Sequence, residues 1–234
     1  MNSRISVIAL GLLLAGCSTD IFNRDAEALD KFSRAYTEFR NAAYDSEIDL
    51  QVTASNVDPF GFWRELRGAL DVRGNNSSRL EHATSAKTLY GTAIIKALEV
   101  CGVSLDNMDK AVLQLVETAN GIRSTEFRTD ASGVAKAARE IHSAFGTLHD
   151  LLEKRLQLQA DVLTDITLDG GQFRATPLFR RRGDDANRIT AEIEAISQRS
   201  TEASQRLKDA FSALKGKAKL KDYPFKEDAD QKPH

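Results

Sequence analysis

The longest amphipathic pattern in the chain is residues 132–164, SGVAKAAREIHSAFGTLHDLLEKRLQLQADVLT. Its apolar residues recur every three or four positions, which places them on one side of an α-helix, because about 3.6 residues complete a turn. An unbroken helix over this segment is roughly 50 Å long at about 1.5 Å per residue. The stripe consists of Val134, Ala138, Ile141, Phe145, Leu148, Leu152 and Leu156, with Val162 near its end.

Stripes of the same spacing occur on both sides of this segment. They lie in residues 23–46, in residues 104–122 and from Asp184-Asp185 onward. Residues 48–52 alternate apolar and polar side chains instead, so the sequence leaves open whether the first helix ends or continues there. A helix with one apolar stripe is marginal alone in water, so the stripes must face one another. We therefore predict an all-α fold, an elongated antiparallel helical bundle of four to five helices.

Start and stop signals divide the chain further. Asp58-Pro59 suits the start of a short helix, because Pro costs no hydrogen bond at the first helical position. Ser78-Arg-Leu-Glu81 has the spacing of a capping box. Gly102 is able to end the helix that this box opens, and Ser104 is able to cap the next one. Gly170-Gly171 stop the long central helix.

Composition supports this class and excludes one kind of partner. The 234 residues are 41% hydrophobic and 28% charged, with only 4 Pro, which suits long helices with a real core. The 32 basic and 34 acidic residues nearly balance. Because no strong positive field attracts a phosphate backbone, we expect no binding of nucleic acid.

The N-terminus has the three parts of a secretory signal: Arg4, an apolar run over residues 5–15, and small residues before Cys17. This run is shorter than the roughly 20 residues that a membrane-spanning helix requires. Leu14-Ala15-Gly16-Cys17 resembles the lipobox of bacterial lipoproteins. The resemblance covers only Met1 to about Asp20. It implies a diacylglyceryl group on the Cys17 thiol and cleavage just before that residue.

The same resemblance implies a location. Residue 18 is Ser, whereas Asp after the cysteine favours the inner membrane, so we expect the outer membrane with the domain facing the periplasm. An ordinary secretory signal that contains Cys17, or an uncleaved anchor, is the alternative. Beyond this region we find no family resemblance. The predicted organisation is a signal peptide (1–16), a lipid-anchored linker (17–22), a helical bundle domain (23–214) and a flexible charged tail (215–234).

The sequence predicts no catalytic residue, cofactor or metal site. The chain lacks the common haem, zinc-protease, nucleophile-elbow and phosphate-loop motifs. His142 and His149 are two helical turns or roughly 10 Å apart, too far to share a metal ion with ligand distances near 2 Å. Cys101 has uncharged sequence neighbours, so we expect a buried thiol at a helix end, with an intermolecular disulfide as the alternative.

Three features are candidates for interaction. Phe60-Gly-Phe62-Trp63 concentrates three aromatic residues, which either plug one end of the bundle or form an exposed anchor. Arg180-Arg181-Arg182 lies in a predicted loop and either is simply solvated or contacts anionic lipid or an acidic protein. The tail either serves solubility or contacts anionic envelope polymers through Lys215, Lys217, Lys219 and Lys221.

Together these patterns predict a lipid-anchored envelope protein whose helical periplasmic domain binds or scaffolds another protein and catalyses no reaction. The expected partners are the membrane, through lipid on Cys17, and another envelope protein. One alternative is an immunity or inhibitor lipoprotein that captures a toxin or enzyme, and another is a carrier of a small apolar ligand. The identity of the partner and the oligomeric state stay open.

Overall fold

A computed structural model of the protein describes the backbone of residues 5–57, 59–71, 73–89, 92–169, 172–175, 177–221 and 223–225. Side chains are described from Asp25 onward, except at residues 58–60, 72, 89–94, 166–176, 180, 222 and 226–234. The side chains of the predicted signal peptide and linker, Cys17 among them, therefore lie outside the description, as do the last residues of the predicted tail.

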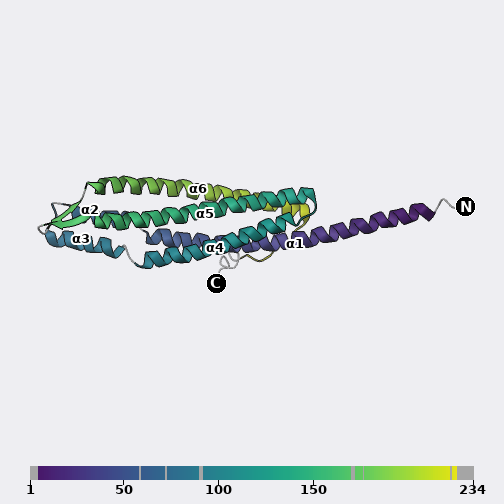
Figure 1. Cartoon of the computed structure of the whole chain (residues 1–234), viewed down its shortest axis with the longest axis horizontal. Helices are drawn as coiled ribbons and strands as arrows, with labels where there is room; N and C mark the ends of the chain where they lie inside the picture. The colour runs from purple at the N-terminus through teal and green to yellow at the C-terminus, as the bar shows by residue number, and fades with distance from the viewer. Residues whose placement is uncertain are drawn as a thin grey trace. The chain divides into compact units, whose positions relative to one another are not determined.

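The described chain is almost entirely helical, which confirms the all-α class (Figure 1). Six helices are described, one more than the upper limit of the prediction, because the helix predicted from Ser78 to Gly102 is divided between Asn76–Leu89 and Thr92–Asn120. A two-stranded antiparallel hairpin, which the sequence did not predict, joins the last two helices. The elements are α1 (Ile5–Asn56), α2 (Pro59–Leu70), α3 (Asn76–Leu89), α4 (Thr92–Asn120), α5 (Thr125–Thr164), β1 (Ile166–Asp169), β2 (Gln172–Ala175) and α6 (Leu178–Ala218).

The chain divides into two compact units. Unit 1 comprises Met1–Asn41, Asp109–Arg139 and Ala203–His234, and unit 2 comprises Ala42–Met108 and Glu140–Glu202. Helices α1, α4, α5 and α6 contribute residues to both units, whereas α2, α3 and the hairpin belong to unit 2.

Unit 1 has a core of aliphatic and aromatic side chains from all four of its helices. Tyr36 on α1 stacks on Phe211 of α6, with ring centroids 3.5 Å apart and planes 4° from parallel. Asp25 supplies a polar contact: its carboxylate accepts hydrogen bonds from the backbone N–H groups of Arg123 (2.9 Å) and Ser124 (3.2 Å), just before α5 begins. The larger buried residues are Leu29, Phe32, Phe39, Leu115, Ile122, Val134, Leu207 and Leu214.

The ordered part of unit 1 extends beyond the predicted start of the flexible tail. Helix α6 continues to Ala218, and both Leu220 and Phe225 are buried. The Ser33 hydroxyl donates a hydrogen bond to the backbone carbonyl of Lys221 at 2.9 Å. The predicted flexible tail from residue 215 is therefore wrong for the described stretch up to Phe225, because two apolar side chains without a helical spacing are nevertheless buried, and Phe225 lies against Arg40 of α1.

In unit 2, α2 and α3 pack against each other. Arg79 is buried, and its Nε donates to the carbonyl of Ala69 at 2.9 Å. That carbonyl belongs to the last turn of α2, where it has no partner within the helix, so Arg79 closes the end of α2. His82 on α3 contacts the Glu65 carboxylate on α2, with 2.7 Å between Nδ1 and Oε2.

The predicted helix boundary at Gly102 and Ser104 is wrong. Helix α4 runs through Gly102 and Ser104, where the sequence signals predicted an end and a new cap. The Ser104 hydroxyl donates to the Asp49 carboxylate on α1 and lies 3.4 Å from the Val100 carbonyl. Both uses are compatible with a helix interior, and an internal Gly costs only about 1 kcal/mol, so tertiary packing overrides the local signal.

The last helix begins earlier than predicted, at Leu178. Pro177 directly precedes it, which suits a residue that donates no backbone hydrogen bond. Asp185 lies inside the helix and pairs with Arg188 at 3.1 Å, instead of capping its start. Residues 180–182 are therefore helical, and the prediction that they form a loop is wrong.

Glycines at two positions give a test of this packing. An alanine at position 68 places its Cβ 2.6 Å from the His82 ring, which Glu65 holds in place. We expect Gly68→Ala to destabilise the protein by about 1–3 kcal/mol, despite the better helix propensity of alanine. Gly146→Ala, on α5, meets no described atom within 4 Å and should stabilise by about 0.5–1 kcal/mol. Urea unfolding measures both; equal signs would contradict the α2–α3 contact.

Candidate functional site

Two of the predicted interaction features meet at one end of unit 2. Helix α2, which carries the aromatic segment, lies where α5 ends and α6 begins, next to the hairpin (Figure 1). Phe62 and Leu66 of α2 are buried against Val162 of α5, and Trp63 and Phe179 pack onto this cluster. Residues about 120 positions apart in the sequence are thus brought together.

The aromatic segment mostly serves packing. Phe62 is 1% exposed, and Trp63 is partly buried. Trp63 meets Phe62 and Phe179 edge-on, with centroid separations of 5.4 and 6.4 Å. Edge-to-face pairs of this kind stabilise a core beyond the area that they bury. The prediction of an exposed anchor therefore does not hold for Phe62 and Trp63, while the side chain of Phe60 lies outside the described ones.

The same end of the unit contains buried donors without a described partner. The indole Nε1 of Trp63 and the amide Nε2 of Gln159 are both buried, and neither makes a hydrogen bond to any described group. A buried donor of this kind costs about 1–3 kcal/mol relative to a paired one.

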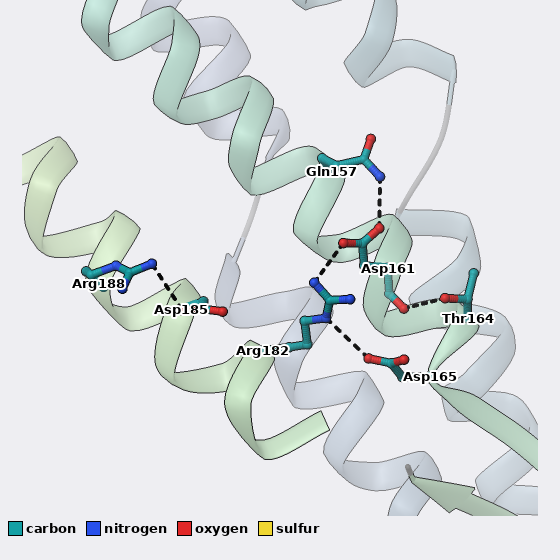
Figure 2. A network of polar contacts seen from close by, with 7 residues as sticks. All are labelled: Gln157, Asp161, Thr164, Asp165, Arg182, Asp185 and Arg188. Carbon is teal, nitrogen blue, oxygen red and sulfur yellow. Dashed lines mark hydrogen bonds and ion pairs between the residues drawn. The ribbon is translucent and has the colours of Figure 1, made fainter. Parts of the chain in front are cut away.

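Arg182 joins the two long helices at this end (Figure 2). Its Nη1 lies 2.9 Å from Asp161 Oδ2, and its Nε lies 3.4 Å from Asp165 Oδ2. Gln157 donates to the second oxygen of Asp161 at 2.9 Å, and Thr164 donates to its backbone carbonyl at 2.7 Å. The guanidinium therefore fastens the first turns of α6 to the last turn of α5 across the hairpin.

The three arginines consequently do not act as one exposed patch. Arg182 is occupied inside the unit, Arg181 is exposed, and the side chain of Arg180 lies outside the description. The prediction that the three arginines together contact anionic lipid or an acidic protein therefore loses Arg182. Its charge is paired with the carboxylates of Asp161 on α5 and of Asp165 just after α5.

Cys101 has the environment of a structural thiol. It is 0% exposed on α4, and burial together with the nearby Asp49 carboxylate raises its pKa to about 11. Thiolate is the nucleophilic form, so a raised pKa removes reactivity at neutral pH. Its burial agrees with the sequence prediction, although the helix does not end there.

We expect Cys101 to resist alkylation in the folded protein. With a pKa of about 11, roughly one thiol in a thousand is ionised at pH 8. In a Cys17→Ser background, iodoacetamide should therefore label the native chain at least about 100-fold more slowly than the urea-unfolded chain. Mass spectrometry of quenched samples measures both rates. Similar rates in the two states would show that the thiol is accessible.

Two acidic side chains, Asp150 and Glu153, lie close to His149. Its Nε2 lies 3.1 Å from the carbonyl of Leu98, and its metal-ligating atoms lie within 4.8 Å of those of Asp150 and Glu153. Asp150 and Glu153 are exposed on one face of α5. Exposed acidic groups are common without an ion, so we assign no metal to this group.

Helices α1 and α4 run antiparallel and side by side in unit 2. Thr53 of α1 contacts the carbonyl of Ala97 at 3.2 Å, and Asp49 of α1 accepts the hydrogen bond of Ser104. Residue numbers therefore rise along α1 in the direction in which they fall along α4. Among the described side chains, four exposed aliphatic residues lie beside this seam: Ile48 (40% exposed), Val52 (50%), Val100 (46%) and Val103 (60%).

These four residues form one surface, which we call the aliphatic strip. Three of them directly precede a residue that hydrogen-bonds across the seam: Ile48 precedes Asp49, Val52 precedes Thr53, and Val103 precedes Ser104. The fourth, Val100, directly precedes the buried Cys101. Consecutive residues of a helix point in directions about 100° apart, so a residue just before a seam residue points to one side of the seam. Because the two helices are antiparallel, this side is the same for both of them. The seam contacts also place Val52 level with Val100, and Ile48 level with Val103.

No protein-family model, curated protein or solved structure matches the chain. Within the part of the chain that the structure describes, none of the helices has both the length and the apolar character to cross a membrane. The function is therefore inferred from the residues and their arrangement.

Proposed function

We propose that the protein is a lipid-anchored component of a bacterial envelope whose helical domain binds another envelope protein and catalyses no reaction. The observation that carries the binding role is the aliphatic strip on α1 and α4. Single exposed aliphatic residues are normal on a protein surface, but neighbouring ones mark interaction sites.

The strip suits an apolar helix face of the partner. Val and Ile are stiff at their first side-chain torsion, so little conformational freedom is lost when a partner covers them. Two antiparallel helices leave a shallow groove between them, and a third helix can place its apolar residues along it. Exposed polar residues flank the strip, among them Glu47 and Gln51 on α1 and Lys96 on α4. An apolar centre with a polar rim is typical of protein interfaces.

The proposed anchor supports this role. A domain held at a membrane by acyl chains on Cys17 meets other envelope proteins at a raised local concentration, so a modest interface suffices for binding. The lipobox resemblance of Leu14-Ala15-Gly16-Cys17 is the ground for this anchor. The binding role and the anchor can be tested independently, because they depend on different residues. The strip lies in unit 2, whereas the proposed anchor is Cys17, which precedes the described side chains.

Affinity purification of strip variants tests the binding role. The test protein carries Val52→Glu and Val100→Glu. The matched control carries Leu80→Glu and Leu113→Glu, at two leucines outside the strip that are each 57% exposed. We expect one stoichiometric envelope protein to be recovered with the wild-type chain and the control, and to be lost from the strip variant. Recovery that is unchanged by the strip substitutions would refute the proposal. Self-association that depends on the strip would instead identify a second copy as the occupant.

A further inference from the structure

A pocket of about 310 Å³ lies in unit 1. Its walls come from the Ser33–Arg40 part of α1, from the last turns of α6, and from the segment 221–225 that follows α6. This volume is at the lower end of the range of small-molecule sites, about 300–1,000 Å³. The pocket lies apart from the aliphatic strip, which belongs to unit 2.

The charge of this pocket is one-sided. Arg40, Lys208, Lys215 and Lys221 line it, and among its described lining residues there is no carboxylate. Like charges that converge on one cavity repel one another and raise the local concentration of anions. Asp30, one turn before Ser33 on α1, is engaged by the Tyr223 hydroxyl and by Arg34 at 3.0 Å, and the charge of Lys221 also helps to lower its pKa. The charged side chains among the described lining residues are therefore all positive.

Arg40 is held in place from two sides. Its Cζ lies 3.7 Å from the centroid of the Phe225 ring, and its side chain hydrogen-bonds to Tyr36. Burial raises the pKa of the Tyr36 phenol, while the Arg40 charge opposes this shift. Stacking uses the face of a guanidinium, whereas its N–H donors lie along its edge. Such a preorganised fork loses little freedom when it binds an anion.

The third wall is also fixed. Ser33 donates to the Lys221 carbonyl at 2.9 Å, and the Tyr223 hydroxyl accepts a hydrogen bond from Arg34 Nε at 3.1 Å. These contacts tie the segment after α6 onto α1. The backbone of Lys221 is thereby fixed beside α1, and its side chain lines the cavity together with Lys208 and Lys215 of α6.

We propose that this pocket binds a phosphate monoester, which is either a soluble phosphate ester or the headgroup of a lipid. Such a group carries about −1.5 to −2 charges at pH 7, and its three terminal oxygens accept hydrogen bonds from several directions. Arg40 offers a fork of donors, and the three lysines offer charges from the other walls. The Tyr36–Phe211 stack supplies an apolar surface for the rest of the ligand. This inference does not rest on the proposed protein-binding role.

Calorimetric titration with inorganic phosphate and with glycerol phosphate, at constant ionic strength, tests the soluble arm. Vesicles of phosphatidylcholine with and without phosphatidic acid test the lipid arm, with Cys17→Ser in every chain so that the proposed anchor does not contribute. The pocket variant carries Lys208→Gln and Lys221→Gln. The control carries Lys110→Gln and Lys136→Gln, two exposed lysines of unit 1 outside the pocket, with the same change in charge.

We expect the pocket variant to bind at least about tenfold more weakly than the wild-type chain, and the control to bind within about twofold of it. All four substituted lysines are exposed, so both variants should fold. Binding in the titrations identifies a soluble ester as a ligand, and binding that requires phosphatidic acid identifies a lipid headgroup. No binding in either arm would overturn the proposal, as would equal weakening of the pocket variant and the control.

Discussion

Replacing Phe62 by alanine should lower the free energy of unfolding of unit 2 by about 3–5 kcal/mol. The ring is 1% exposed and is buried against Leu66 and Val162, so its removal leaves a cavity between α2 and α5. Trp63 is the only tryptophan of the chain and lies against this ring. Its fluorescence during urea unfolding therefore reports the loss at the site itself.

Leu80→Ala is the matched control for this prediction. Leu80 lies on α3 in the same unit but is 57% exposed, so its truncation should change the free energy of unfolding by less than about 0.5 kcal/mol. If the two variants unfold at the same urea concentration, α2 is not packed on α5. The aromatic segment would then regain its role as a candidate exposed anchor.

The helical core was predictable because its signal extends over many turns. Of the stripe residues from Val134 to Val162, all are buried except Leu148, which is partly buried. A periodicity that persists for so long leaves no other face for the core. Helix ends rest on one or two residues, and there the prediction failed. Gly102 is a typical helix-ending residue, but α4 continues through it. The residues before and after it are held by other helices, because Leu98 contacts His149 of α5 and Ser104 donates to Asp49 of α1.

The arrangement at the end of unit 2 could not be predicted from the sequence. The aromatic segment and the arginines each gave a signal, but nothing indicated that the two meet or that Asp161 and Asp165 engage Arg182. Their meeting depends on the unpredicted hairpin, which returns the chain directly from α5 to α6. Its four-residue strands are too short for a periodic signal.

The aliphatic strip did leave a trace in the sequence. Residues 48–52 alternate apolar and polar side chains, and this left the end of the first helix open. In a helix, Ile48 and Val52 are one turn apart on a common face, and Leu50 lies on the opposite, buried face. Apolar residues on both faces of this helix therefore indicated an exposed apolar surface in addition to the face that packs in the core. The register against α4, which completes the strip, appears only in the structure.

The proposed anchor makes the second large prediction: Cys17→Ser should move the protein from the membrane fraction to the soluble fraction. Each buried acyl methylene contributes about 0.8 kcal/mol, and a single chain gives only marginal binding. The diacylglyceryl group implied by the lipobox supplies two chains, so the loss of one sulfur atom changes membrane partition by several orders of magnitude. Fractionation with detection of the chain measures this change.

Cys101→Ser separates this effect from the loss of any thiol. Cys101 is buried in unit 2, so its replacement should leave the protein with the membrane, even if the fold is slightly less stable. Mass spectrometry of the native protein identifies the cause: an N-terminal residue 17 that carries acyl chains agrees with the anchor. A chain that retains Met1, or one trimmed to Cys17 with an unmodified sulfur, would contradict it. The aliphatic strip and the cationic pocket would then need partners outside a membrane context.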